Sequence, residues 1–320
     1  MDATPAELGS IFYKPMLITH QITRRAALLA PATAAILRAL PLGQVKLGVT
    51  TDEIDDDVAT AAKFLREFKL EWAEVRNIWG KYNTALPTER VTEAKKIFDQ
   101  HGLRTSILGT AFFKIPLPPD TPEGRGILDN QWSLLDGAME RAKILGTDKI
   151  RVFAFTHGAN EKPDARHYAR IYELVSEAAR RAHRRNFRLA LENVGNSYVW
   201  SGAQAAQLLA HVKHEALGLT WDPNNAGQTG ERSFPDGYKL LDPARIFHVH
   251  LRDYRKNAEG KYEWCAVGDG EMDNLGQIRT LRKHGYKEAY TLETHYKHPD
   301  GKAAASRTSL AALLKVFAAV

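Results

Sequence analysis

The sequence contains very little cysteine. Cys265 is the single cysteine among 320 residues, so the chain can form no intramolecular disulfide and no cysteine cluster can hold a metal. The chain also lacks an apolar run long enough for a membrane-spanning helix. Its net charge of +6 is mild, and the densest basic group is Arg180, Arg181, Arg184 and Arg185. That group is typical of a solvated helix end, so we expect no nucleic-acid partner. Because no apolar run is long enough, we also expect no stable membrane span.

Residues 1–44 differ in pattern from the rest of the chain. Arg24 and Arg25 precede a moderately apolar, alanine-rich run, as in a twin-arginine (Tat) export signal, and Met16 would be a natural start for such a leader. This pattern predicts a protein that is periplasmic or exported through the Tat pathway. The alternative is an ordinary amphipathic N-terminal helix on a cytoplasmic protein.

From residue 45 onward, strand patterns and helix patterns alternate eight times. The strands are expected at Val45–Thr51, Trp72–Asn77, Arg104–Gly109, Lys149–Phe155, Phe187–Asn193, Leu217–Asp222, Ile246–Asp253 and Ala289–His295. Helices are expected at Asp57–Lys69, Val91–His101, Asn130–Leu145, Ala165–Arg185, Ala203–His214, Leu275–His284 and Ser309–Ala319. Eight such units over about 275 residues predict an α/β fold, a single-domain (β/α)₈ TIM barrel spanning residues 45–320. The alternative, a doubly wound sheet, would usually show a glycine-rich phosphate turn after its first strand, and residues 48–53 do not form one.

One predicted strand carries two histidines. Residues 246–253 read Ile-Phe-His-Val-His-Leu-Arg-Asp, and side chains alternate across a strand, so His248 and His250 point to the same side. Two imidazoles on one face of an apolar strand are costly unless something binds them. They could be core histidines satisfied by hydrogen bonds, or ligands of a metal.

Carboxylates interrupt three other predicted strands at their carboxyl ends. Glu192, Asp222 and Glu293 occupy those positions, and a TIM barrel gathers such strand ends around one point. Three buried carboxylates repel one another unless a cation lies between them. With His250 they form an oxygen-rich set without thiolate, which suits Mn²⁺, Mg²⁺, Co²⁺ or Zn²⁺.

The second half of the chain resembles the xylose isomerase-like TIM-barrel superfamily, in its sugar phosphate isomerase/epimerase branch. The matching motifs are Leu-Glu-Asn at 191–193, Trp-Asp-Pro-x-Asn-Ala at 221–226, His-Val-His-Leu-Arg-Asp at 248–253, Val-Gly-Asp-Gly-Glu-Met-Asp at 267–273 and Leu-Glu-Thr-His at 292–295. The resemblance implies one divalent ion, Mn²⁺ being favoured, held by Glu192, Asp222, His250 and Glu293. It also implies that the two glutamates are catalytic and exchange protons with a carbon next to a carbonyl or hydroxyl group.

The substrate-binding positions depart from this resemblance. Keto-sugar 3-epimerases carry a glutamate, a histidine and an arginine where this chain has Tyr198, Asn225 and Lys256. Endonuclease IV-type relatives use extra histidines to bind three zinc ions, and one of those positions is again Asn225, which argues against a DNA-repair site. The residues expected to line the pocket are His248, Asn225, Arg252, Lys256 and His295.

The expected chemistry is sugar or polyol isomerisation or epimerisation. A divalent ion chelated by adjacent carbonyl and hydroxyl oxygens acidifies the carbon-bound hydrogen and stabilises an enediolate. Two alternatives stay open: a metal-dependent lyase, dehydratase or glycoside-cleaving enzyme on the same scaffold, and a sugar-binding barrel without catalysis. The partner in every case is a small sugar-derived molecule, and the sequence leaves the formation of a homo-oligomer open.

Overall fold

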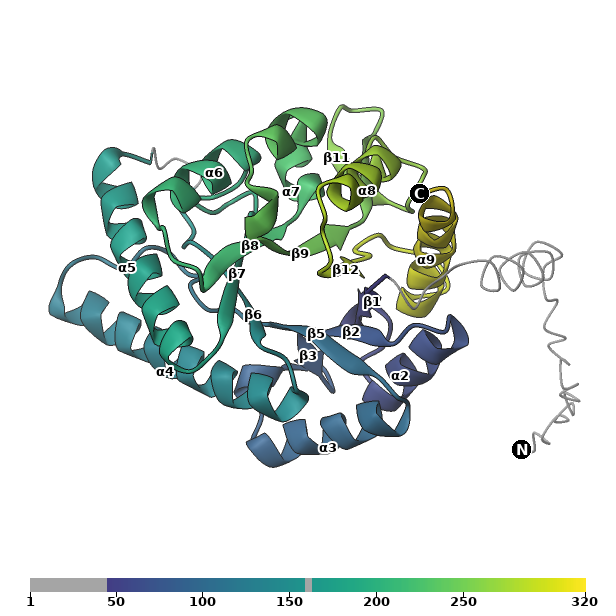
Figure 1. Cartoon of the computed structure of the whole chain (residues 1–320), viewed down its shortest axis with the longest axis horizontal. Coiled ribbons are helices and arrows are strands. Elements are labelled where there is room, and N and C mark those ends of the chain that lie inside the picture. Colours follow the sequence, from purple (N-terminus) through teal and green to yellow (C-terminus); the bar gives the residue numbers. More distant parts are fainter. Residues whose placement is uncertain (1–44, 159–162) are drawn as a thin grey trace, which may run out of the picture.

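Eight parallel strands close into a barrel in the computed structural model, which describes residues 45–158 and 163–320 (Figure 1). The barrel strands are β1 (Leu47–Thr50), β2 (Trp72–Val75), β5 (Arg104–Gly109), β6 (Lys149–Val152), β7 (Arg188–Glu192), β8 (Leu217–Trp221), β9 (Ile246–Leu251) and β12 (Ala289–Leu292). Their order around the barrel follows the chain, and β12 pairs with β1 to close it. The predicted single-domain (β/α)₈ barrel is confirmed.

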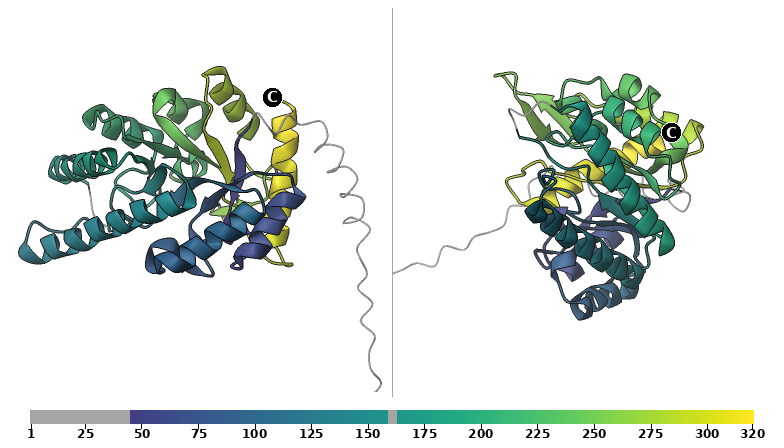
Figure 2. Two further views of the ribbon diagram at one scale, coloured as in Figure 1. Left: turned by 60° about the horizontal axis from the view of Figure 1, so that its bottom comes forward. Right: turned by 90° about the vertical axis from the view of Figure 1, so that its left-hand side faces the viewer.

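Helices surround the strands as an outer layer (Figure 2). They are α2 (Val58–Glu67), α3 (Thr88–Gln100), α4 (Pro122–Leu145), α5 (Ala165–Arg184), α6 (Gly202–His211), α7 (Pro223–Gln228), α8 (Asn274–Lys283) and α9 (Lys302–Ala318). In α5, Ile171, Val175 and Ala178 are buried, and their spacing of four and three residues places them on one face of the helix. Asp164 starts α5 by accepting the backbone amides of residues 166 and 167.

Two helices begin seven or eight residues earlier than their sequence patterns predict. Helix α4 starts at Pro122 rather than at Asn130 because the Thr121 side chain accepts a hydrogen bond from the backbone amide of Gly124 and caps the first turn. Glycine in that first turn lowers helix propensity and hid the start. Helix α9 starts at Lys302 rather than at Ser309.

A hairpin that the sequence pattern did not predict follows β9. Strands β10 (Asp253–Lys256) and β11 (Tyr262–Cys265) pair antiparallel. The Asp253 carboxylate accepts hydrogen bonds from the backbone amides of Gly268 at 2.9 Å and Met272 at 3.0 Å. A Cβ at Gly270 would lie 2.2 Å from the same carboxylate, so only glycine lets this loop close over Asp253.

Residues 1–44 lie outside the described residues. The domain boundary at residue 45 and the Tat-type signal at Arg24 and Arg25 therefore stay predictions. Within the described part of the chain, no helix combines the length and the apolar character that crossing a bilayer requires.

Candidate metal centre

The barrel brings Glu192, Asp222, His250 and Glu293 together at the carboxyl ends of its last four strands. Glu192 ends β7, Asp222 follows β8, His250 lies near the end of β9, and Glu293 follows β12. The Nδ1 atom of His250 lies 3.6 Å from Glu192 Oε1, 3.6 Å from Asp222 Oδ2 and 3.4 Å from Glu293 Oε2. All four residues are buried, so one ring nitrogen and three carboxylate oxygens face a common point inside the protein.

The hydrogen bond of His250 fixes which ring nitrogen is free to bind a cation. Its Nε2–H group donates to Glu74 Oε2 at 2.9 Å, because a carboxylate can only accept. In the neutral ring Nδ1 then carries a lone pair, and it makes no hydrogen bond to any described residue. A lone pair that faces three carboxylate oxygens requires positive charge between them, so the donor set fits a divalent metal ion.

The charges of the buried groups point the same way. Four carboxylates, those of Glu74, Glu192, Asp222 and Glu293, share this interior with the buried guanidinium groups of Arg151 and Arg252. That leaves two negative charges, which one divalent cation neutralises. A third guanidinium, that of Arg76, reaches the edge of this group at Glu293 and also pairs with the two further carboxylates of Asp52 and Glu53, so it does not remove the negative excess.

The pKa of His250 reflects the negative charge of the surrounding carboxylates. Burial disfavours the charged ring, but the carboxylates of Glu74 and Glu293 outweigh burial and hold the pKa of His250 well above its usual range. His248 differs, because burial lowers its pKa to about 4. The centre therefore attracts positive charge at Nδ1 of His250, whether a proton or a metal ion provides it.

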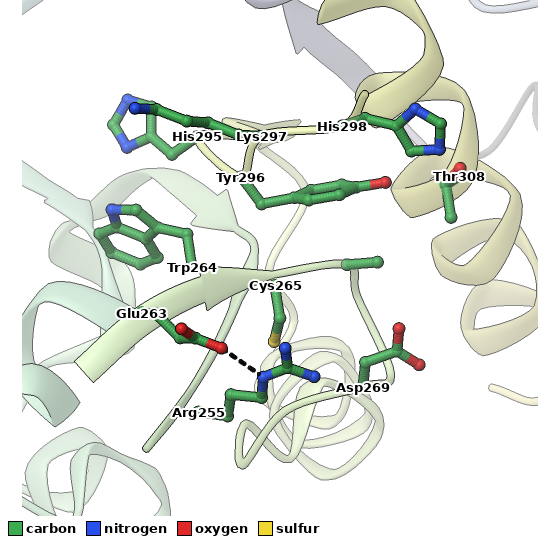
Figure 3. A pocket seen from close by; sticks show the side chains of 11 residues that line it. Arg255, Glu263, Trp264, Cys265, Asp269, His295, Tyr296, Lys297, His298 and Thr308 are labelled. Carbon is green, nitrogen blue, oxygen red and sulfur yellow. Dashed lines mark hydrogen bonds and ion pairs between the residues drawn. The ribbon is translucent and has the colours of Figure 1, made fainter. Parts of the chain in front are cut away.

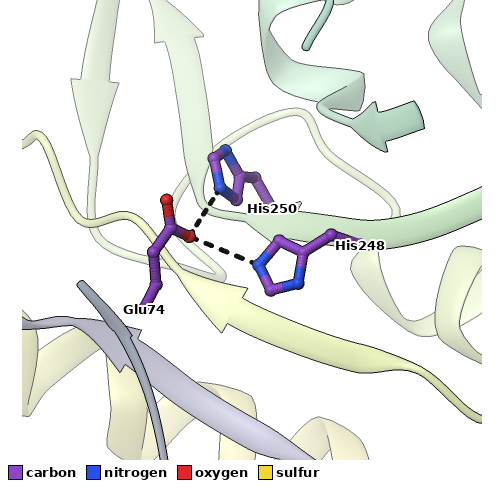
Figure 4. Close-up of side chains that lie close together, drawn as sticks. All are labelled: Glu74, His248 and His250. Carbon is purple, nitrogen blue, oxygen red and sulfur yellow. Dashed lines mark hydrogen bonds and ion pairs between the residues drawn. The ribbon is translucent and has the colours of Figure 1, made fainter. Parts of the chain in front are cut away.

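Glu74 is a functional candidate that the sequence analysis missed. It lies in β2, across the barrel from β9, and its Oε2 atom lies 2.9 Å from Nε2 of His250 and 3.3 Å from Nε2 of His248 (Figure 4). Its other oxygen, Oε1, lies 3.1 Å from Arg151, whose Nε atom is 3.3 Å from Glu192 Oε2. The one available signal was a carboxylate inside an otherwise apolar strand, Trp72–Val75.

Arg252 and Asn225 hold the carboxylates in place. Arg252 forms ion pairs with Asp222 and, at 2.8 Å, with Glu293 Oε2, and it donates to Asn225 Oδ1 at 2.9 Å. The amide of Asn225 donates in turn to Glu192 Oε1 at 3.2 Å. Asn225 thus bridges Arg252 and Glu192 at the position where keto-sugar 3-epimerases carry a histidine.

The other three residues expected to contact substrate lie at different depths. His248 is fully buried and its Nε2 lies 2.8 Å from Thr291 Oγ1. His295 is partly exposed, and its Nε2 lies 3.2 Å from Glu53 Oε1. Lys256 is exposed at the end of β10. Substrate contact by each of the five expected residues stays a prediction.

Two further groups of carboxylates and histidines in the described residues already have N–H donors facing their carboxylates. Glu53, Glu293 and His295 form the first, and Arg76 donates to Glu53 at 2.7 Å and to Glu293 at 2.8 Å. In the second, Glu74 faces the Nε2 atoms of His248 and His250. Neither group sets an unpartnered ring nitrogen against three carboxylates, so the first-described centre fits a cation better than either.

The profile of one protein family matches residues 62–316. The chain belongs to the xylose isomerase-like TIM barrel family. This confirms the resemblance found in the sequence. The buried His, Glu and Asp side chains of the barrel suit an enzyme of this family. A search of curated proteins finds no match.

Solved structures show the same fold at low sequence identity. The IOLI protein, solved with a bound zinc atom, is 18% identical with a TM-score of 0.70, and the match covers 86% of this chain and 99% of that one. The 3-keto-D-glucoside 4-epimerase YcjR from E. coli is 17% identical with a TM-score of 0.63, covering 85% and 99%. The probable 3-DHS dehydratase AsbF from Bacillus anthracis is 16% identical with a TM-score of 0.64, covering 82% and 98%.

Proposed function

We propose that the protein is a divalent-metal-dependent sugar or polyol isomerase or epimerase. The observation that carries this proposal is the convergence of Glu192, Asp222, Glu293 and the Nδ1 atom of His250 on one buried point. These four residues would hold the ion, for which Mn²⁺ is the first choice and Mg²⁺, Co²⁺ or Zn²⁺ the alternatives. When bound, such an ion polarises a substrate carbonyl and acidifies the hydrogen on the neighbouring carbon.

Glu192 and Glu293 would move the proton. They come from β7 and β12, which lie on either side of β8 and β9 in the barrel, so their carboxylates approach the common point from different directions. One glutamate removes the carbon-bound proton, and the other returns a proton. Return to the opposite face of the same carbon inverts that centre, whereas return to the adjacent carbon interconverts an aldose and a ketose.

The arginines around the centre would orient both glutamates and keep Glu293 ionised. Arg151 lies 3.3 Å from Glu192 Oε2 and 3.5 Å from Glu293 Oε1. Burial alone would raise the pKa of Glu293, but His295 and Arg252 hold that pKa well below its usual range. A base must be deprotonated before it can accept a proton, and these contacts favour that state.

Proton exchange with heavy water tests the proposal. The protein is loaded with Mn²⁺ and incubated in D₂O with a panel of aldoses, ketoses, 3-keto sugars and polyols. The products are freed of paramagnetic ion and read by NMR. Deuterium at a carbon next to the carbonyl, without loss of water or of a leaving group, supports an isomerase or epimerase. Release of water or of an aglycone would contradict the proposal and favour the lyase alternative. Sugar binding without deuterium exchange and without release of a leaving group would favour the sugar-binding barrel.

Glu74→Gln should weaken metal binding by about 10–100-fold, the usual effect of losing a carboxylate behind a metal-binding histidine. The amide keeps the shape but removes the charge that fixes the Nε2–H tautomer of His250. Isothermal titration with Mn²⁺ measures the change. Glu288→Gln is the matched control, because Glu288 pairs with Lys149 and Arg188 away from the centre. Equal affinities in the two variants would show that Glu74 does not support the site.

A further inference from the structure

A cavity of about 740 Å³ lies next to the β10–β11 hairpin (Figure 3). The β10–β11 hairpin and residues 266–269 form one wall, and the segment after β12 forms the other, with Thr308 of α9 at its end. Its volume lies within the range of sites that bind small molecules. Nothing in the proposed proton transfer uses this space.

Two residues of the cavity wall contact residues of the centre. The indole ring of Trp264 lies under the Arg252 guanidinium, 4.1 Å from ring centroid to carbon, and meets the His295 ring edge-on at 5.6 Å. Arg252 forms ion pairs with Asp222 and Glu293. Trp264 and His295 both line the cavity, and His295 Nε2 lies 3.6 Å from Glu293 Oε1, so one layer of side chains separates the cavity from the centre.

The side chains in the cavity suit a neutral, polar ligand with apolar faces. Its walls carry the aromatic rings of Trp264, Tyr296 and His298. Charges of opposite sign balance: Arg255 pairs with Glu263 at 2.7 Å, and Lys297 and Asp269, both exposed, add one charge of each sign. A sugar ring matches this combination, because its C–H faces pack on aromatic rings while its hydroxyl groups bond to the polar side chains.

A neighbouring cavity offers a useful contrast. It measures about 460 Å³ and shares the segment His295–His298 with the first cavity. It lacks Trp264, and its remaining walls carry Asp52, Glu53 and Asp56, which pair with Arg76 and Lys302. This dense set of charges favours ions or water over a sugar face. The first cavity, called the aromatic cavity below because Trp264, Tyr296 and His298 line it, is therefore the better place for a neutral sugar ring.

We propose that the aromatic cavity binds a second glycosyl unit, attached to the sugar that reacts at the metal centre. The substrate class is then a disaccharide or larger glycoside rather than a free monosaccharide. This inference rests on the proposed function for the position of the reacting sugar. Trp264 and Tyr296 supply the stacking surfaces, and Arg255, Glu263 and Lys297 supply hydrogen bonds to hydroxyl groups.

Isothermal titration of the Mn²⁺-loaded full chain tests the subsite. The ligands are matched pairs: glucose against cellobiose and maltose, and galactose against lactose. We expect a disaccharide to bind about 10-fold or more tightly than its monosaccharide, equivalent to about 1.4 kcal/mol. Trp264→Ala should abolish this preference while retaining its Mn²⁺, which also shows that the variant is folded. Tyr296→Ala should reduce the preference as an independent variant.

Tyr262→Ala is the matched aromatic control. Tyr262 lies in the same strand, β11, but lines a different cavity, so its loss should leave the preference intact. Equal affinity for both members of every pair, or an unchanged preference in Trp264→Ala, would overturn the subsite. Deuterium exchange into monosaccharides without any disaccharide preference would overturn the subsite alone. A Trp264-dependent preference without deuterium exchange into any sugar would support the subsite and contradict the proposed reaction.

Discussion

Glu192→Gln and Glu293→Gln should each lose about 10²–10⁴-fold in turnover, the usual contribution of general acid–base catalysis. Glutamine keeps an oxygen that can face the cation, but its amide cannot accept the substrate proton. Both variants should therefore retain some metal, which separates loss of the base from loss of the ion. Steady-state rates on the substrate identified by deuterium exchange, together with metal content, measure the effect.

The two glutamine variants also distinguish the direction of proton transfer. An epimerase that uses both faces of the carbon would leave one variant able to exchange the substrate hydrogen with solvent without inverting the centre. Glu288→Gln serves as the control, because this glutamate pairs with Lys149 and Arg188 away from the centre, and it should keep normal turnover. Near-normal turnover in both active-site variants, with metal bound, would contradict the two-glutamate mechanism.

Arg151→Met should lower the free energy of unfolding of the metal-free protein by about 3–5 kcal/mol, the cost of leaving buried charges without their partner. Arg151 is fully enclosed and lies within 3.1–3.5 Å of Glu74, Glu192 and Glu293. Methionine has a similar length but brings no charge to the three carboxylates. Urea unfolding of the dialysed protein measures the difference.

Arg188→Met provides the comparison for this stability change. Arg188 also lies in a barrel strand and pairs with Asp148 and Glu288, but a third of its side chain is exposed. Solvent screens such pairs, so we expect a loss of only about 0–1 kcal/mol. If the two arginine variants lose equal stability, the buried carboxylates do not depend on Arg151 for their neutralisation.

The barrel and the four converging side chains could be predicted because their signals are local. Each strand is a short apolar run, and each of Glu192, Asp222 and Glu293 interrupts such a run at its carboxyl end. His248 and His250 are two residues apart, which places both on one face of β9, and in the structure both rings do face Glu74. The fold then brings the four strand ends together.

The network behind these side chains could not be predicted because its members are distant in sequence. Glu74 and His250 are 176 residues apart, and Glu74 and Arg151 are 77 apart. Glu74 occupies the third position of a four-residue strand, where a carboxylate in isolation looks like a solvent-facing residue. Only the closed barrel shows that this position points inward to β9 and β6.

Two residues in short elements that follow barrel strands were similarly difficult to predict. Asn225 was identified as a departure from keto-sugar 3-epimerases, but its bridge between Glu192 and Arg252 depends on how the short helix α7 enters the centre. The β10–β11 hairpin has no strong alternating pattern, so Trp264 was not recognised beside Arg252. Both residues gain their roles from neighbours on other strands.

Metal content and position in the Mn²⁺-loaded protein test this account most directly. After dialysis, mass spectrometry should find about one equivalent per chain, and a crystal should show one anomalous peak bonded to His250 Nδ1 and to Glu192, Asp222 and Glu293. His250→Ala should lose the ion, whereas His248→Ala should retain it. No bound ion, two or three equivalents, or a single peak at Glu53 and His295 would contradict the assignment.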